Sequence, residues 1–407
     1  EYPEYGSYYG YMTRGCKNHC PFCVVPVIEP KEKSYISIKR KIKKTNAMFG
    51  EQHNLLLLDN NVLASKDFDK IIDEIKDCGF VVGAKYVLPN KLEIAVKLLC
   101  QNYNDRACVN KIVKLLNAFF DRLEDDEQKK LYHLLEQYDL LDTCTATKEN
   151  ALVVYEEIKE LYEAKRLKSV RNRYVDFNQG VDARELTEEK MAKLSEIPIR
   201  PLRIAFDHWA LREIYENAIR LAAKYKVTNL SNYLLYNFND RPIELYYRMR
   251  LNVELCDRLG VNIYSFPMKY HPIKDTEYLR NREYIGKHWN RKFIRAIQAV
   301  LNATKGKIGK GKSFFYKAFG QDESEFEKIL YMPESFIIYR KHFEDNGTTE
   351  QWWSAFSSLN SEDRAIVEGI IKTNDFTNIV LSDFNAASQQ ILHFYMISRD
   401  DAEKELK

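Results

Sequence analysis

The chain has 407 residues, which is long enough to bury one barrel-sized domain together with a smaller one. Hydrophobic residues make up 45% and charged residues 30% of it, as in globular proteins, and a formal net charge of +3 excludes a strongly basic or acidic chain overall. No run of about 18 apolar residues is present to span a membrane and no secretory signal is visible, so we expect a cytoplasmic protein that contacts no membrane.

The first predicted element is a strand over residues 7–14, and it leads directly into a loop with three cysteines, Cys16, Cys20 and Cys23. Three and then two residues separate these cysteines, so the loop can wrap one corner of a four-iron cluster. Such a cluster normally takes four thiolates, and three leave one iron open to a small molecule. The alternatives are three unrelated thiols or a structural zinc site, which needs a fourth ligand that His19 cannot easily supply from inside the loop.

After the cysteine loop the apolar pattern alternates between helical and strand spacing. Helices are predicted over residues 37–49 and 67–78, with a buried strand over 53–59 between them. The alternation resumes after residue 171 with strands over 173–178, 202–207, 229–238 and 262–270, separated by helices over 187–194, 211–225 and 242–259. Six strands that alternate with helices indicate a parallel α/β sheet.

Two long segments depart from this alternation. Residues 85–171 carry Leu, Lys and Glu at helical spacing, and we interpret them as a helical insertion between the second and third strands; a separate domain is the alternative. From residue 274 to 407 strand signals fade and helical segments follow one another, so we expect a C-terminal helical domain whose last residues, 400–407, are frayed. The predicted sheet is therefore built from residues 1–84 and 172–273.

The segment Thr13-Arg14-Gly15-Cys16 through Cys20-Pro21-Phe22-Cys23-Val24-Val25-Pro26 resembles the signature of the radical S-adenosylmethionine (radical SAM) superfamily. The resemblance is nearest to the branch that includes methylthiotransferases and enzymes with cobalamin-binding N-terminal domains. It extends from about residue 8 to about residue 273, with residues 85–171 as an interruption. It implies a partial (β/α)6 TIM-like barrel with a helical insertion and a C-terminal helical domain.

The resemblance also implies cofactors and a reaction. A 4Fe–4S cluster on Cys16, Cys20 and Cys23 would bind S-adenosylmethionine (SAM) and cleave it reductively to methionine and a 5′-deoxyadenosyl radical, which abstracts hydrogen from a substrate. An external one-electron reductant of the flavodoxin or ferredoxin type is implied as a partner. Because the chain starts at Glu1 rather than Met, an upstream cobalamin-binding domain is a further possibility. The second cluster and the C-terminal β-domain of methylthiotransferases are not visible.

In such barrels the chemistry takes place at the carboxyl ends of the strands. Asp59, Asn60 and Asn61 follow the second strand, where the superfamily often has Gly-Gly-Glu. By this position alone, Asn60 and Asn61 are predicted to hold the SAM amino group, because amide oxygens accept hydrogen bonds from an ammonium group. An Asx turn or a helix cap is the alternative.

The later strand ends supply further candidates. After the third strand, Gln179 and Asp182 are predicted to bind the SAM ribose and Arg184 its carboxylate, with a turn and a surface salt bridge as the alternative. His208, after the fourth strand, is the candidate proton carrier; an idle His beside a helix cap is the alternative. On the last two strands, Asn232 and Met268 are predicted to contact the cofactor.

A basic segment follows the predicted sheet. Residues 306–313 match the P-loop pattern, but a helix predicted over 287–303 stands where a strand is required, so we expect no nucleotide hydrolysis. No acidic residue occurs between Glu283 and Asp322, whereas nine cations do: Lys287, Arg291, Lys292, Arg295, Lys305, Lys307, Lys310, Lys312 and Lys317. Together with a second basic run over residues 31–44, this segment predicts a nucleic acid or phosphate-bearing substrate. Solvated helix faces are the alternative.

A rival function follows from the same two features. The three loop cysteines could hold zinc in a non-catalytic module that binds nucleic acid through the basic segment. The remaining cysteines show no pairing pattern, and most are expected to be buried thiols of a reduced cytosol: Cys78, Cys100, Cys108, Cys144 and Cys256.

Overall fold

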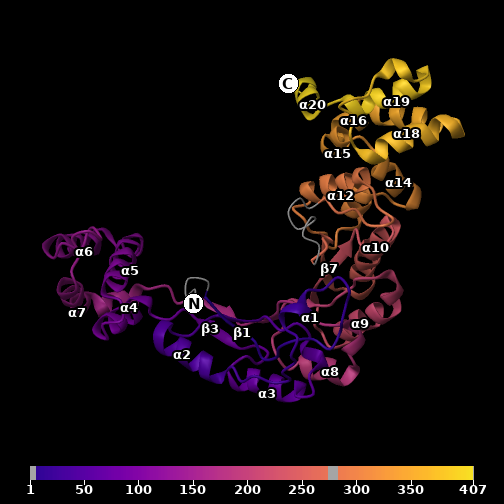
Figure 1. The fold of residues 1–407 in the computed structure, drawn as a ribbon. Helices are drawn as coiled ribbons and strands as arrows, with labels where there is room; N and C mark the ends of the chain where they lie inside the picture. The colour runs from indigo at the N-terminus through magenta and orange to yellow at the C-terminus, as the bar shows by residue number, and fades with distance from the viewer. Residues whose placement is uncertain (1–5, 274–282, 407) are drawn as a thin grey trace. The chain divides into compact units, whose positions relative to one another are not determined.

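The computed structural model of the chain describes residues 6–273 and 283–406, which form two compact units (Figure 1). The N-terminal unit comprises residues 1–14, 33–179 and 192–200, and the C-terminal unit comprises residues 15–32, 180–191 and 201–407. Both contain helices and a short parallel sheet, so the predicted mixed α/β class is confirmed.

The sheet of the N-terminal unit has three parallel strands in the order β1 (Ser7–Gly10), β2 (Asn54–Leu57) and β5 (Val175–Phe177). Leu55 pairs with Tyr8 on one side and with Val175 on the other, and all three side chains are buried. The helices α2 (Lys39–Phe49) and α3 (Phe68–Asp77) have close to the predicted bounds. Carboxylate oxygen Oε1 of Glu74 on α3 accepts a 2.7 Å hydrogen bond from the backbone N–H of Ile38, which joins α3 to the start of α2.

Residues 85–171 contain four helices and begin and end in short strands. β3 (Lys85–Val87) and β4 (Val170–Asn172) pair antiparallel, and between them lie α4 (Lys91–Cys100), α5 (Asp105–Asn117), α6 (Asp125–Gln137) and α7 (Lys148–Lys165). Asn90, Asn104 and Thr147 cap α4, α5 and α7. The four helices contribute to one hydrophobic core that runs in sequence from Leu92 to Tyr162, so this helical insertion, as we call it below, has a core of its own.

The sheet of the C-terminal unit is also parallel and three-stranded, in the order β6 (Leu202–Arg203), β7 (Asn229–Tyr236) and β8 (Asn262–Lys269). Three further helices, α8 (Glu188–Leu194), α9 (Arg212–Lys224) and α10 (Pro242–Leu259), match the predicted helices within a residue. Gly260 ends α10 in the left-handed conformation that favours glycine.

A single six-stranded sheet is not formed within the described residues. The strand predicted over 202–207 is shortened to β6, because its ladder with β7 covers only Leu202 and Arg203. On its other edge the backbone bonds to the loop at Val181. The carbonyl of Arg203 accepts from the N–H of Val181, and the N–H of Ala205 donates to the carbonyl of Val181. Isolated bridges at Val175 and Val181 thus replace continuous strand pairing between the third and fourth predicted strands.

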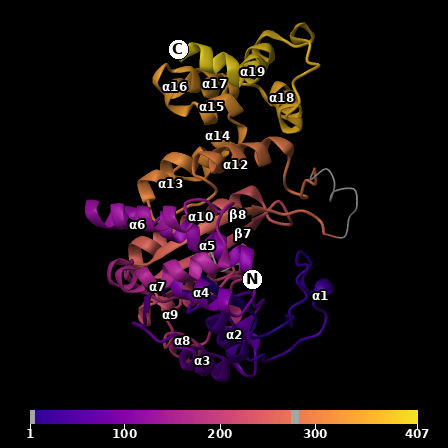
Figure 2. The same cartoon turned by 90° about the vertical axis from the view of Figure 1, so that its left-hand side faces the viewer.

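The C-terminal unit continues as a series of helices, which Figure 2 shows from the side. They are α12 (Arg291–Ala303), α13 (Lys312–Phe319), α14 (Glu323–Tyr331), α15 (Glu334–Ile338), α16 (Arg340–Asp345), α17 (Thr348–Ser357), α18 (Ser361–Thr373), α19 (Ala386–Met396) and α20 (Arg399–Glu405). Trp352, Phe336 and Phe356 are fully buried among them. The predicted fraying of residues 400–407 is wrong over most of its length, because a capping box between Ser398 and Asp401 starts α20. The predicted boundary at residue 274 lies outside the described residues.

None of the described helices is both long enough and apolar enough to cross a lipid bilayer.

The basic segment is less exposed than its sequence predicts. Lys292 on α12 is only 1% exposed, and its amine donates to the carbonyl oxygen of Met332. Arg295 forms an ion pair of 2.8 Å with Glu334. Acidic and carbonyl groups from elsewhere in the chain therefore engage at least two of the nine cations of the segment. The P-loop match follows a helix and not a strand, as expected.

Burial lowers the Lys292 pKa from its usual 10.5 to about 7; Arg295 acts in the same direction, and Glu334 opposes them. Between about pH 7 and 10.5 the unfolded chain keeps the Lys292 proton, whereas the folded protein loses it. The free energy of unfolding of the wild type therefore rises with pH in this range and is lowest below pH 7. Replacing Lys292 by Met should therefore raise the free energy of unfolding by ~1–3 kcal/mol at about pH 6, and by less at about pH 9.

Urea denaturation of both proteins at the two pH values measures this difference. Lys317→Met, at an exposed position of α13, is the matched control and should leave stability nearly unchanged. An equal increase in the free energy of unfolding for Lys292→Met at both pH values would contradict a buried amine that is neutral above pH 7.

Candidate functional site

The three cysteines of the loop lie in the C-terminal unit, where all are partly exposed and none forms a disulfide. Backbone N–H groups approach two of the sulfur atoms: Asn18 donates to Cys16 Sγ at 3.4 Å and Val25 to Cys23 Sγ at 3.5 Å. Burial raises the pKa of Cys20 and Asp207 adds to the effect, while Arg184 opposes it.

Gly15 makes the entry to this loop possible. Its φ of +74° is left-handed, and a Cβ placed there would lie 3.0 Å from the carbonyl oxygen of Lys31 and 3.1 Å from Glu32 Cα. Its N–H donates to a carboxylate oxygen of Glu29 at 2.8 Å, just after the short helix α1 (Val25–Ile28). A side chain at this position would push the two ends of the loop apart, so the sequence requires glycine here.

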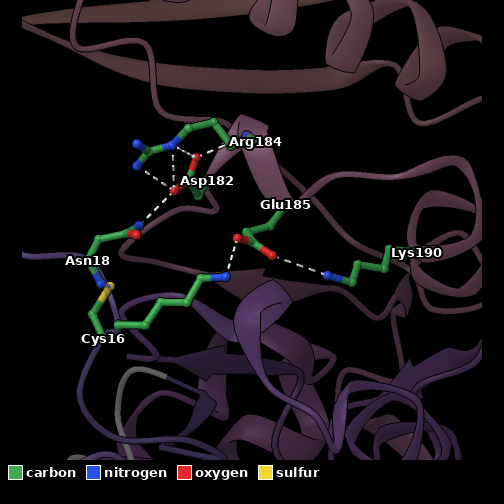
Figure 3. Close-up of polar contacts among 7 residues, drawn as sticks. Cys16, Asn18, Asp182, Arg184, Glu185 and Lys190 are labelled. Carbon is green, nitrogen blue, oxygen red and sulfur yellow. Dashed lines mark hydrogen bonds and ion pairs between the residues drawn. The ribbon is translucent and has the colours of Figure 1, made fainter.

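Two polar contacts hold the loop against the 3₁₀ turn η4 (Ala183–Glu185), as Figure 3 shows. The Asn18 side-chain amide donates to Asp182 Oδ2 at 2.7 Å, and the Lys17 amine lies 2.5 Å from Glu185 Oε1. Both pairs lie within the C-terminal unit. We call this pair of contacts the loop clamp.

Sequence analysis assigned one residue of the clamp, Asp182, and the neighbouring Arg184 to SAM. Asp182 accepts from the Arg184 guanidinium at 2.7–3.1 Å and from the Arg184 backbone N–H at 3.0 Å. Burial acts to raise the pKa of Asp182, but these bonds and the one from Asn18 hold it below its usual value. The structure thus brings Asp182 and Arg184 to the cysteine loop, with their charged groups bonded to each other.

Aromatic rings pack the loop at the carboxyl ends of the C-terminal sheet. The Phe22 ring lies edge-on to Phe238, with centroids 5.8 Å apart, and 6.4 Å from the imidazole of His208. Tyr270 packs edge-on against Phe238, with centroids 4.7 Å apart. Since His208, Phe238 and Tyr270 follow β6, β7 and β8 respectively, all three sit where parallel sheets carry their chemistry. The candidate proton carrier His208 is thus placed against the cysteine loop.

Asn232 and Met268, the two strand residues predicted to contact the cofactor, lie on opposite faces of this sheet. The Asn232 amide is 1% exposed and donates to the Tyr215 hydroxyl at 2.7 Å, which in turn donates to Asn252 at 2.8 Å. This network joins β7 to α9 and α10, so Asn232 faces the helices and serves packing. Met268 is 50% exposed. It stays a candidate for contact with a ligand.

The remaining predicted residues belong to the N-terminal unit. Asn60 is half-buried, Asn61 is buried at the start of the turn η2 (Val62–Ala64), and Gln179 is exposed beyond β5. The neighbouring Asp59 is fully buried: its Oδ1 accepts from Thr13 Oγ1 at 2.6 Å and from the Met12 N–H at 2.9 Å. Burial raises the pKa of Asp59 to about 6. Asp59 thus fixes the backbone that leads to the cysteine motif, a role that sequence analysis missed.

The fully buried Arg248 on α10 holds the strand ends beneath the loop. Its guanidinium donates to the carbonyl oxygens of Phe206 at 3.1 Å, Asp207 at 2.9 Å and Leu235 at 2.8 Å. It also pairs with the buried carboxylate of Asp240 at 3.1 Å. Burial raises the pKa of Asp240, and Arg248 opposes this shift. One side chain therefore connects the end of β7 with the segment after β6.

Of the five cysteines outside the loop, Cys108 and Cys256 are buried, Cys78 is half-buried, and Cys100 and Cys144 are exposed. The expectation that most are buried is wrong, because Cys100 lies on the outer side of α4 and Cys144 in the turn before α7. Within residues 6–273 and 283–406, no group of three or more His, Cys, Asp or Glu side chains is arranged to hold a metal ion.

No protein-family model matches the chain, and no curated protein is significantly similar to it.

Replacing Arg248 by Met should destabilise the protein by ~3–5 kcal/mol, because Asp240 and three carbonyl groups lose their partner inside the protein. Urea denaturation followed by far-UV circular dichroism measures the change. Arg250→Met is the matched control: Arg250 lies two residues further along α10, pairs with Glu254 at 2.7 Å and is 38% exposed, so its loss should cost about 1 kcal/mol or less. Equal effects of the two substitutions would rule out the holding role of Arg248.

Proposed function

We propose that this chain is a radical SAM enzyme, in which Cys16, Cys20 and Cys23 hold a 4Fe–4S cluster and SAM occupies the open iron. The observation that carries the proposal is the position of the loop: three cysteines at cluster spacing, clamped to η4 and packed at the carboxyl ends of parallel strands. A partial (β/α)6 barrel is part of the proposal. Two sets of three parallel strands with intervening helices support it.

The number and kind of sulfur ligands in the loop support such a cluster, although the described structure does not gather the three thiols into a metal-binding arrangement. Three thiols without disulfide bonds occur within eight residues, and two of them accept backbone hydrogen bonds, an environment that stabilises sulfur ligands. When bound, the cluster and SAM would supply one-electron reductive cleavage of the sulfonium, with the electron coming from a flavodoxin or ferredoxin type of partner.

The chain's own residues have the tasks of positioning and shielding. Gly15 allows the loop to turn, and Asn18 and Lys17 fix it to η4. Phe22, next to Cys23 in the sequence, packs its ring on Phe238, and in the proposed enzyme these apolar rings would limit the access of water.

The assignment of SAM-binding residues changes in part. Asn60, Asn61 and Gln179 stay the proposed contacts to the amino group and ribose. Asp182 and Arg184 are now proposed to position the cysteine loop, because their charged groups bond to each other and to Asn18. Met268 remains a proposed contact for the adenine.

The rival proposal, a zinc module that binds nucleic acid, has lost part of its support. It depends on the basic segment, in which Lys292 is buried and Arg295 is paired with Glu334. A phosphate-bearing substrate would have to be recognised by the other cations of the segment.

Changing Cys16, Cys20 or Cys23 singly to Ala should abolish the reductive cleavage of SAM, because each would remove one thiolate ligand from the cluster. The measurement is the formation of methionine and 5′-deoxyadenosine by anaerobically reconstituted protein with dithionite. Cys78→Ala is the control, since this half-buried thiol lies on the other unit, outside the loop, and its loss should leave cleavage unchanged. Cleavage at the wild-type rate by any of the three loop variants would contradict the proposal.

A further inference from the structure

The helical insertion carries a cavity of about 140 Å³ that is open to solvent on one side and has no part in the proposed reaction. Its wall is formed by apolar side chains of α5 and α7 and of the turn between α5 and α6, among them Leu115, Phe119 and Tyr162. The rings of Phe119 and Tyr162 have centroids 4.7 Å apart and belong to the core of the insertion. The cavity is therefore part of a packed structure.

The polar part of the cavity lining is positive. Arg122 and Arg166 both line it, and none of its lining residues is acidic. Arg166 is fixed in place: its Nε donates to Glu163 at 2.6 Å and its Nη1 to the carbonyl oxygen of Leu88 at 2.6 Å. Arg122, at the end of the turn η3 (Phe120–Arg122), has no carboxylate within ion-pair distance in the part of the chain that the structure describes.

The charges around the cavity act on the pKa of the Tyr162 phenol. Burial raises its pKa, while Arg122 and then Arg166 act in the opposite direction. Arg122 thus places a positive charge at a largely apolar wall, whereas the charge of Arg166 is offset by its partner Glu163. An apolar cavity beside an arginine with no acidic partner matches a ligand that combines a ring or branched chain with one negative charge.

We propose that this cavity binds a small aromatic or branched-chain carboxylate, with its apolar part against Phe119 and Tyr162 and its carboxylate on Arg122. The size supports this class of ligand: an apolar cavity of about 150 Å³ holds a benzene ring, whereas drug-sized ligands need about 300–1,000 Å³. An inorganic anion alone would leave the apolar wall uncovered. The site lies outside the cysteine loop, so the proposal goes beyond the radical SAM function and does not depend on it.

Benzoate is the probe, and ligand-observed NMR titration of the 407-residue chain without a cluster is the measurement. Benzoate should bind with a Kd on the order of 1 mM, as befits a fragment of this size, and the uncharged benzamide should bind about tenfold more weakly. Arg122→Gln should weaken benzoate binding about tenfold, because the charged hydrogen bonds to the carboxylate are lost. Arg106→Gln is the matched control, since Arg106 is exposed on α5 and does not line the cavity.

A second variant tests the location. Ala118 lines the cavity at the exposed end of α5, so Ala118→Phe should fill it and abolish benzoate binding while the far-UV circular dichroism spectrum stays unchanged. Three results would overturn the proposal: no benzoate binding to the wild type, equal binding of benzoate and benzamide, or unchanged binding in Arg122→Gln. Weak binding of sulfate and benzoate alike would indicate an unspecific anion effect and would overturn it as well.

Discussion

The buried guanidinium of Arg248 is the interaction on which the candidate site depends. Parallel strands end in carbonyl groups that no neighbouring strand satisfies, and a buried carbonyl without a partner is costly. Arg248 satisfies three of these groups after β6 and β7 and neutralises the buried carboxylate of Asp240. His208 and Phe238, which contact the cysteine loop through Phe22, lie next to these same groups. The stability of the C-terminal unit and the position of the loop thus have a common cause.

The loop itself is positioned by weaker contacts, and this suits a segment that has to accept a cofactor. Asn18 contributes one hydrogen bond to a carboxylate, worth about 1.5–3 kcal/mol, and Lys17 contributes one partly exposed ion pair. Gly15 contributes the conformation that only glycine adopts without strain. In the proposed enzyme only a few contacts hold the loop, so the thiols keep some freedom to adjust to metal ions.

Sequence patterns predicted the elements that depend on neighbouring residues. The predictions failed where a residue or element depends on a partner far away in the chain. The helix over 242–259 was predicted to the residue, because proline at its start and Gly260 at its end mark its bounds. The strand over 202–207 was too long, since its ladder with β7 ends at Arg203 and only an isolated bridge from Ile204 to Val181 follows. Asn232 was predicted to contact a ligand because a polar residue on a buried strand is typical of a binding site. In the structure its amide instead donates to the Tyr215 hydroxyl in the core. Asp59, Arg248 and the burial of Lys292 each depend on partners at least eight residues away, and no spacing rule reveals them.

The most direct test of the account is the electron paramagnetic resonance spectrum of the anaerobically reduced protein, recorded before and after the addition of SAM. Three thiolates on a four-iron cluster leave one iron open, so the account predicts an iron–sulfur signal whose shape changes when SAM binds. A protein that shows no such signal and contains about one zinc per chain would contradict it. An iron–sulfur signal that SAM leaves unchanged would also contradict it, because the open iron would then have another ligand.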